Sequence, residues 1–120
     1  MIRYLSRLVL LKHGDTTMAK LLQVDFEFNG PFGEDMAKAF VELAESINRE
    51  PGMIWKIWTE SAKDKLGGGI YLFEDEASAQ AYLQMHTARL QQMGIGEVRG
   101  HIFDINQPLT AINNSPINQR

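Results

Sequence analysis

Along residues 21–29, Leu-Leu-Gln-Val-Asp-Phe-Glu-Phe-Asn, every second side chain from Leu22 onward is apolar. This alternation predicts a β-strand with one buried face. Gly30 and Pro31 end the strand, and an apolar stripe with helical spacing follows. Four residues form the stripe: Met36, Phe40, Leu43 and Ile47. The change of period predicts a strand followed by one amphipathic helix.

The same two periods return after Pro51. Residues 53–60 and 70–73 are rich in aromatic and β-branched side chains and predict two further strands. Asp75 is placed to cap a second helix, and residues 97–105 predict the last strand. The order β-α-β-β-α-β predicts an α+β, ferredoxin-like fold, a four-stranded antiparallel sheet with two helices on one face.

Three consecutive glycines, Gly67, Gly68 and Gly69, follow the second predicted strand. They match neither the Walker phosphate loop nor the dinucleotide-binding motif. We therefore predict a flexible hairpin loop or bulge at this point, and no phosphate site.

The patterned sequence begins at Met18. Residues 1–17 hold basic side chains around a short apolar run, which is far below the roughly 20 residues needed to span a bilayer. No small-residue cleavage site follows it. We expect residues 1–17 to be a non-essential extension, 18–106 to form the domain, and 107–120 to form a polar tail, because that segment has no sequence period.

Composition narrows the classes of function. The chain has 120 residues, a net charge of −3 and no cysteine. Its acidic balance and lack of a basic run argue against nucleic-acid or anionic-membrane binding. The absence of cysteine removes disulfides and thiolate sites and fits a cytoplasmic location.

The second and third predicted strands carry large apolar side chains that would point to both faces of the sheet. Two helices cover only one face, so the other face would expose an apolar patch. We expect a second copy to cover it, which predicts a homodimer. Trp55 and Trp58 lie three positions apart and should face opposite sides.

His86 is the most informative polar residue, because it interrupts the apolar stripe of the second helix. It is either a core histidine, bonded to a backbone carbonyl or to Tyr71, or a pocket histidine acting as a base or a donor. Arg89, three positions on, is either an exposed charge or a group that stabilises an anion. Asn29 is placed either to form a turn or to line a pocket. His101 has no partner at metal-ligand spacing, and no G-x-S-x-G motif occurs, so we predict no metal site and no serine hydrolase.

Five segments together resemble the YdhR family of monooxygenases, and the resemblance runs from about Met18 to about Asn113. These segments are residues 26–33, 43–48, 55–61, 68–73 and 86–90. The resemblance implies the dimeric α+β barrel group, which includes the antibiotic-biosynthesis monooxygenases. Members resembling those enzymes oxidise aromatic substrates with molecular oxygen and use no metal or flavin.

The resemblance implies a pocket between sheet and helices. It implies catalytic roles for His86, Arg89 and Asn29. It also implies substrate-binding roles for five aromatic residues: Trp55, Trp58, Tyr71, Phe73 and Tyr82. The leading interpretation is a cofactor-independent monooxygenase acting on a small aromatic or quinone-like compound. The alternatives are a non-catalytic binding protein for a hydrophobic ring and a haem-binding protein with His86 as axial ligand.

Overall fold

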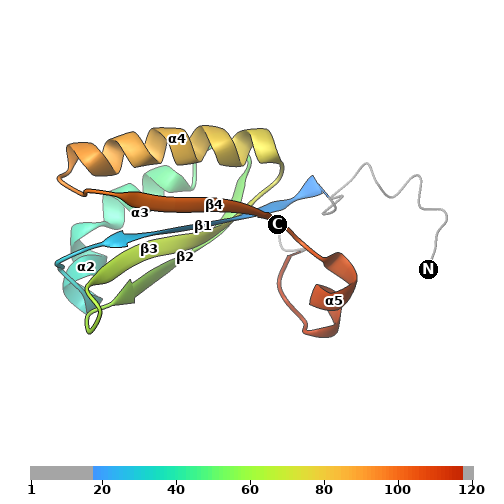
Figure 1. The fold of residues 1–120 in the computed structure, drawn as a ribbon, viewed down its shortest axis with the longest axis horizontal. Helices are drawn as coiled ribbons and strands as arrows, with labels where there is room; N and C mark the ends of the chain where they lie inside the picture. Colours follow the sequence, from blue (N-terminus) through green and yellow to red (C-terminus); the bar gives the residue numbers. More distant parts are fainter. Residues whose placement is uncertain (1–17, 118–120) are drawn as a thin grey trace.

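The computed structural model describes residues 18–117, and our expectation for residues 1–17 lies outside this range. Figure 1 shows the helices and strands with their labels. They are β1 Lys20–Glu27, α2 Gly33–Ala39, α3 Val41–Ile47, β2 Met53–Ser61, β3 Leu66–Phe73, α4 Glu76–Gln92, β4 Val98–Asp104 and α5 Gln107–Ile112. No helix within residues 18–117 is long and apolar enough to cross a membrane.

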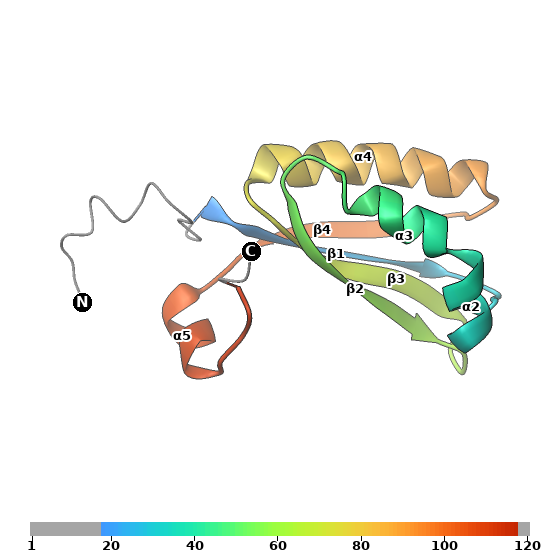
Figure 2. The ribbon, with the colours of Figure 1, turned by 180° about the vertical axis from the view of Figure 1, so that it is seen from behind.

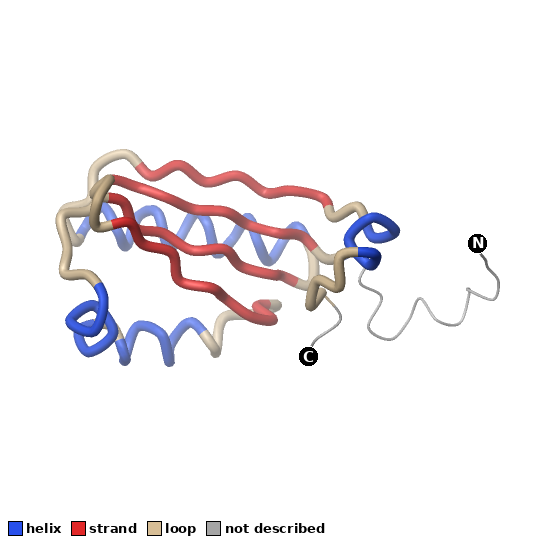
Figure 3. The backbone as a smooth tube through the Cα atoms, turned by 90° about the horizontal axis from the view of Figure 1, so that it is seen from below, coloured by secondary structure: helices blue, strands red, loops and turns tan. Residues whose placement is uncertain are grey.

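The four strands form one antiparallel sheet in the order β2-β3-β1-β4, with the β1 and β3 strands at its centre. The α2, α3 and α4 helices lie over one face (Figures 1 and 2), which we call the covered face. Seen from the other side, the strands are in front of α4, whereas α2 and α3 lie beside one edge of the sheet and α5 lies at one end (Figure 3). We call this second side the open face. The predicted α+β ferredoxin-like fold is confirmed.

The core lies between the covered face and the α4 helix. Alternate residues of β1 point into it, and they pair with residues of β3 that do the same. The buried residues of α4, which recur three or four positions apart, cover this core on the side away from the sheet. The central core residues are Leu22, Val24, Phe26, Tyr71, Phe73, Ala79, Tyr82 and Leu90. The apolar alternation of the sequence therefore identifies the covered face correctly.

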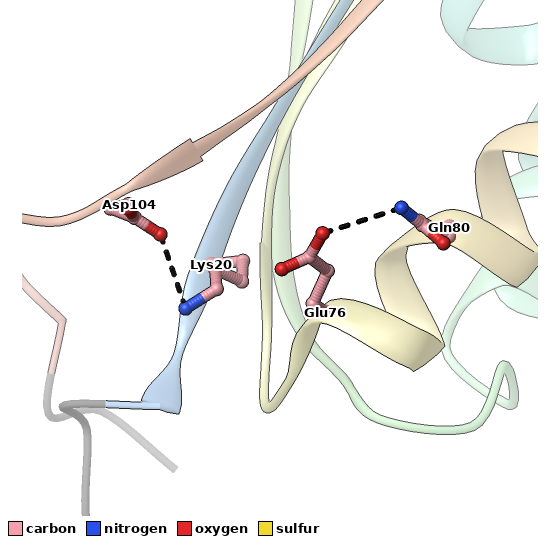
Figure 4. Close-up of polar contacts among 4 residues, drawn as sticks. All are labelled: Lys20, Glu76, Gln80 and Asp104. Atoms are coloured by element: carbon pink, nitrogen blue, oxygen red, sulfur yellow. Dashed lines mark hydrogen bonds and ion pairs between the residues drawn. The ribbon is translucent and has the colours of Figure 1, made fainter.

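The α4 helix begins as its sequence predicts. The side chain of Asp75 accepts a hydrogen bond from the backbone N–H of Ser78 at 2.8 Å, as an N-cap does. Figure 4 shows two polar contacts near this end of the sheet. The Lys20 ammonium lies 3.2 Å from the Asp104 carboxylate across β1 and β4, and Gln80 lies 3.3 Å from Glu76 on α4. Such exposed contacts add little stability, because water screens them.

Two local predictions are wrong. The helix expected over the first stripe is broken at Phe40, whose backbone leaves the helical region at φ −112° and ψ 18°. No proline or glycine stands there, so tertiary packing is the physical reason: the Phe40 ring lies 6.1 Å from Trp58 and 6.4 Å from Phe28. Two short helices, α2 and α3, replace the single predicted one.

The three glycines are not a loop. They lie within β3, and the turn comes earlier, at residues 62–65. A neighbour lies close to the place of a side chain at each glycine: backbone atoms at Gly68, and side chains at Gly67 and Gly69. A Cβ at Gly67 would lie 3.1 Å from the Phe28 ring, a Cβ at Gly68 would overlap the Val24 carbonyl, and a Cβ at Gly69 would lie 2.6 Å from Cε of Lys56.

The predicted tail has structure. Residues 107–112 form α5, which Asn106 caps by accepting a hydrogen bond from the Leu109 N–H at 3.1 Å. A helix of this length is too short to show a period in the sequence. The segment then returns to the sheet: Ile117 is buried, and the Pro116 carbonyl accepts a hydrogen bond from the Trp55 indole at 3.0 Å.

Candidate functional site

His86 lies in the middle of α4 and is 4% exposed. Its ring stacks on Tyr82, one helical turn earlier, with centroids 5.0 Å apart and planes at 27°. The Tyr71 ring meets it edge-on from β3 at 6.4 Å. The imidazole is therefore held between an aromatic side chain of its own helix and one of the sheet below.

Arg89 fixes the tautomer of this histidine. A nitrogen of its guanidinium, Nη2, lies 3.0 Å from Nδ1 of His86. A guanidinium has donors only, so Nδ1 must accept, and the neutral ring then carries its proton on Nε2. Burial first, and then the charges of Lys56 and Arg89, lower the pKa of His86 to about 3. His86 is a neutral hydrogen-bond donor whose single lone pair is already used.

A small cavity of about 30 Å³ adjoins His86 beneath the α2 and α3 helices. This volume suits a water molecule or a single polar atom, and it is too small for an aromatic ring. The cavity is lined by Phe26, Phe28, Met36, Phe40, Leu43, Lys56, Trp58, Gly68, Tyr71 and His86. We call it the inner cavity.

A larger groove of about 460 Å³ lies outside it, between α2, α3 and β2. Its walls include Ala37, Val41 and Ala44 of the two helices and Glu60 of the strand. We call it the outer groove. The groove and the inner cavity share four lining residues: Met36, Phe40, Lys56 and Trp58. These side chains form the boundary between a space of ring size and the place where His86 is buried.

Tyr71 and Tyr82 form a buried pair of phenols. The Tyr82 hydroxyl donates to the Tyr71 oxygen at 3.1 Å. Burial raises the pKa of both side chains, and for Tyr71 the neighbouring Tyr82 raises it further. Both phenols stay protonated near neutral pH, so neither can act there as a base.

Lys56 is the site residue that our sequence reasoning missed. It lies on β2 opposite Tyr71 and points to the covered face. Its ammonium nitrogen lies 3.5 Å from the centroid of the Trp58 ring and 4.7 Å from that of Tyr71. Burial first, and then the charge of Arg89, lower the pKa of Lys56 to about 7. One signal was available: Lys56 is two positions from Trp58, so both side chains share a face.

The remaining expected site residues are dispersed. Trp58 faces His86, whereas Trp55 points to the open face and binds the Pro116 carbonyl. Asn29 is exposed beside the turn at Gly30 and does not line the inner cavity. Phe73 is fully buried and packs on Tyr71 and Tyr82 as part of the core.

The residues present do not suit a haem or a metal ion. His86 uses Nδ1 to accept from Arg89, and the space beside its ring is about 30 Å³, which is far below the size of a porphyrin. Among the residues that the structure describes, no group of three or more histidine, aspartate or glutamate side chains could hold a metal.

Solved structures support the fold. A variant of SnoaB, a cofactor-independent oxygenase from Streptomyces nogalater, has 17% identity and a TM-score of 0.54, with 74% of this chain and 94% of that chain covered. A protein of unknown function from Nitrosomonas europaea has 22% identity and a TM-score of 0.54 over 75% and 92% of the two chains. A "putative antibiotic biosynthesis monooxygenase from Deinococcus radiodurans" has 8% identity and a TM-score of 0.54 over 72% and 92%.

No curated protein matches the chain. A family model does, and it covers residues 21–116, which include every element that builds the inner cavity and the outer groove. The match spans most of the 120 residues and confirms the resemblance seen in the sequence. The chain belongs to the mono-oxygenase family described as "Putative mono-oxygenase ydhR".

Proposed function

We propose that this chain is a cofactor-independent monooxygenase that oxidises a small aromatic or quinone-like compound with molecular oxygen. One observation carries the proposal: His86, held by Arg89 as a neutral donor, lines an aromatic cavity that shares four lining residues with a groove of ring size. The family description and the cofactor-independent oxygenase SnoaB among the similar structures support the same reaction class.

The substrate ring would occupy the outer groove, where Phe40 and Trp58, stacked on each other with centroids 6.1 Å apart, contribute an apolar wall. A hydroxyl or carbonyl oxygen on the ring would reach toward the inner cavity. There, Nε2–H of His86 is the donor that the tautomer makes available. A fixed donor in a space without bulk water stabilises the negative charge that develops on that oxygen after a proton is lost.

The overall reaction balances without an added reductant. A ring CH₂ group flanked by carbonyl or aryl groups becomes C=O, and one O₂ is consumed. One oxygen atom enters the carbonyl and the other leaves as water, which takes both hydrogens. The substrate supplies all the electrons, so the protein needs only to bind the ring, remove a proton and hold the anion.

Oxygen consumption by the purified full-length protein tests the proposal, with anthrone as the probe. We expect saturable O₂ uptake and formation of the quinone, and His86→Leu should lower the rate by about 100-fold, as loss of an oxyanion donor does. The exposed residue Gln84 on α4 offers a matched control, and Gln84→Leu should keep the native rate.

The alternative is a binding protein for a hydrophobic ring without turnover. The observation that favours it is that the outer groove has the volume for a ring, whereas the inner cavity, with about 30 Å³, has not. Saturable binding of anthrone without O₂ uptake would support this alternative and contradict the oxygenase.

We also propose that two copies pack through their open faces. Ile57 is 53% exposed and Phe103 is 42% exposed on that face. An ion pair between Arg99 and Asp25, 2.6 Å apart, lies beside them and would leave part of the interface polar. Burying such residues against a second copy removes apolar surface from water, and stable homodimers bury roughly 2,000 Å² or more.

A further inference from the structure

The proposed oxygenation, on which this inference rests, begins with loss of a proton from the substrate. The buried side chains nearest the inner cavity supply few candidates for the base. His86 has its lone pair occupied by Arg89, whose guanidinium cannot give up a proton. Tyr71 and Tyr82 are phenols that burial keeps protonated. Each of these groups can donate a hydrogen bond or hold an anion, but none can accept a proton at neutral pH.

Lys56 occupies the place where a base is needed. It lines both the outer groove and the inner cavity, so its amine stands at the boundary between the space for a ring and the donor on His86. Among the residues that the structure describes, the ion pairs join Lys20 to Asp104 and Arg99 to Asp25, and neither involves Lys56. The amine therefore has no carboxylate within ion-pair distance among these residues.

The sheet is shaped to let Lys56 take this position. On the adjacent strand β3, Gly69 stands opposite Trp58, and the end of the Lys56 side chain crosses over it. A Cβ at Gly69 would lie 2.6 Å from Cε of Lys56 and 3.2 Å from the Tyr71 ring. Any side chain at Gly69 larger than hydrogen would move the amine. This explains why a glycine stands here within a β-strand.

We infer that Lys56 is the base that removes the proton from the hydroxyl or acidic C–H group of the bound aromatic compound. The neutral amine forms a new N–H bond, the substrate's O–H or C–H bond breaks, and the electron pair stays on the substrate. The products are an ammonium and an aromatic anion. The ammonium rests over the Trp58 ring at 3.5 Å, where the face of the indole stabilises a cation.

Burial and the positive charge of Arg89 favour the neutral amine before the reaction, whereas the carboxylates that face it oppose this. Arg89 and His86 face it from α4, Tyr71 from β3, Glu60 from its own strand and Glu45 from α3 across the outer groove. Burial and Arg89 lower the pKa of Lys56 to about 7. The fraction of neutral amine thus rises as the pH rises through about 7, and the rate of proton removal should rise with it.

The test uses meta-nitrophenol as the probe, because its phenolate is visible by absorption. The full-length protein is examined at a pH above the pKa of Lys56 and below that of the free phenol. The variants are Lys56→Met, which removes the amine, and Lys56→Arg, which keeps the charge but cannot accept a proton. Lys63→Met, in the exposed turn between β2 and β3, is the matched control.

With the native protein and the Lys63→Met control, binding should raise the phenolate fraction about threefold, because the proton moves to Lys56 and the new ammonium and the His86 donor stabilise the phenolate. No proton should then appear in the weakly buffered solution. Lys56→Met should bind the phenol without this rise. Lys56→Arg should bind the phenolate and release one proton per phenol to the solution.

Three results would overturn the inference: no binding of the phenol, an equal phenolate signal in Lys56→Met, or release of the proton by the native protein. A second measurement covers the case in which the variants do not fold. Reductive methylation of native lysines with ¹³C-formaldehyde should give one lysine NMR signal that titrates near pH 7, in addition to the signal of the N-terminal amine. Titration of every lysine in the ordinary range would contradict the assignment. None of these measurements uses O₂. A negative result would therefore rule out Lys56 as the base without ruling out the oxygenase, and absence of O₂ uptake would rule out the oxygenase without ruling out Lys56 as a base.

Discussion

Trp55 and Trp58 lie on the same strand, three residues apart, and have opposite surroundings. Trp58 lies on the covered face, between the Phe40 ring and the Lys56 ammonium, and lines both the inner cavity and the outer groove. Trp55 lies on the open face and donates its indole N–H to the backbone of the C-terminal segment. One tryptophan is positioned for a ligand, and the other holds the chain's own tail.

The same contrast holds for the polar groups of the two faces. Lys56, His86 and Arg89 are brought together on the covered side, with shifted pKa values for Lys56 and His86. On the open face, Asp25 and Arg99 neutralise each other at the surface, 2.6 Å apart. Burying titratable groups costs stability, so their presence on the covered face agrees with the site proposed there.

Replacement of each tryptophan should give the largest difference between the faces. Trp58→Ala removes a wall of the outer groove and the ring beneath Lys56, so kcat/KM for O₂ uptake with anthrone should fall about 100-fold. Trp55→Ala should leave it within about threefold, because its indole does not reach the site. Equal losses in both variants would show that the two faces do not differ in function.

Lys56→Met should stabilise the protein, by about 2 kcal/mol near pH 6, because a desolvated amine is replaced by an apolar side chain. Burial lowers the pKa of Lys56 from 10.5 to about 7 in the folded state. Below pH 7 the folded protein bears the full cost of the buried charge, and this cost fades as the pH rises toward 10.5. Urea unfolding at a series of pH values measures the effect, with Lys63→Met as the control. If the stability gained by Lys56→Met increased with pH, the pKa of Lys56 would not be lowered in the folded protein.

Ile57→Asp tests the role given to the open face. A carboxylate in the middle of the proposed interface should weaken the dimer at least about tenfold, since it would be buried without a partner. Sedimentation at micromolar concentration measures this, and Val41→Asp, an exposed position of α3 in the outer groove and away from the open face, is the control. A native protein that sediments as a monomer would show that the open face has another use.

Tyr82→Phe should have the smallest effect. It removes the hydroxyl that donates to Tyr71 at 3.1 Å and leaves one buried phenol without its partner. The expected loss of stability is about 1 kcal/mol, measured by thermal unfolding. A loss several times larger would indicate that the tyrosine pair orders the helix as well as the core.

The elements with strong periods could be predicted from the sequence. The alternation in β1 and the capped stripe of α4 placed the sheet, its covered face and His86 correctly. The local predictions that were wrong concern features determined by tertiary contacts. The break at Phe40 follows from aromatic neighbours that are distant in sequence, and the glycines of β3 are explained only by Phe28, the Val24 carbonyl and Lys56.

The site could be predicted only in part, for a related reason. A histidine in an apolar stripe stands out, but a lysine between two tryptophans looks like a solvated charge. The covered position of Lys56 depends on its register with Tyr71 across β2 and β3, which the sequence does not display. Asn29 was chosen by resemblance alone, and its exposed turn keeps it away from the inner cavity.

The indole N–H signals of the two tryptophans offer the most direct test of the central claim, that the covered face holds the ligand. The protein contains two tryptophans, so a ¹⁵N-labelled sample should give two such signals, assigned with Trp55→Phe and Trp58→Phe. Titration with anthrone should shift the Trp58 signal in a saturable way and leave that of Trp55 in place. A shift of Trp55 alone, with Trp58 unmoved, would contradict the account.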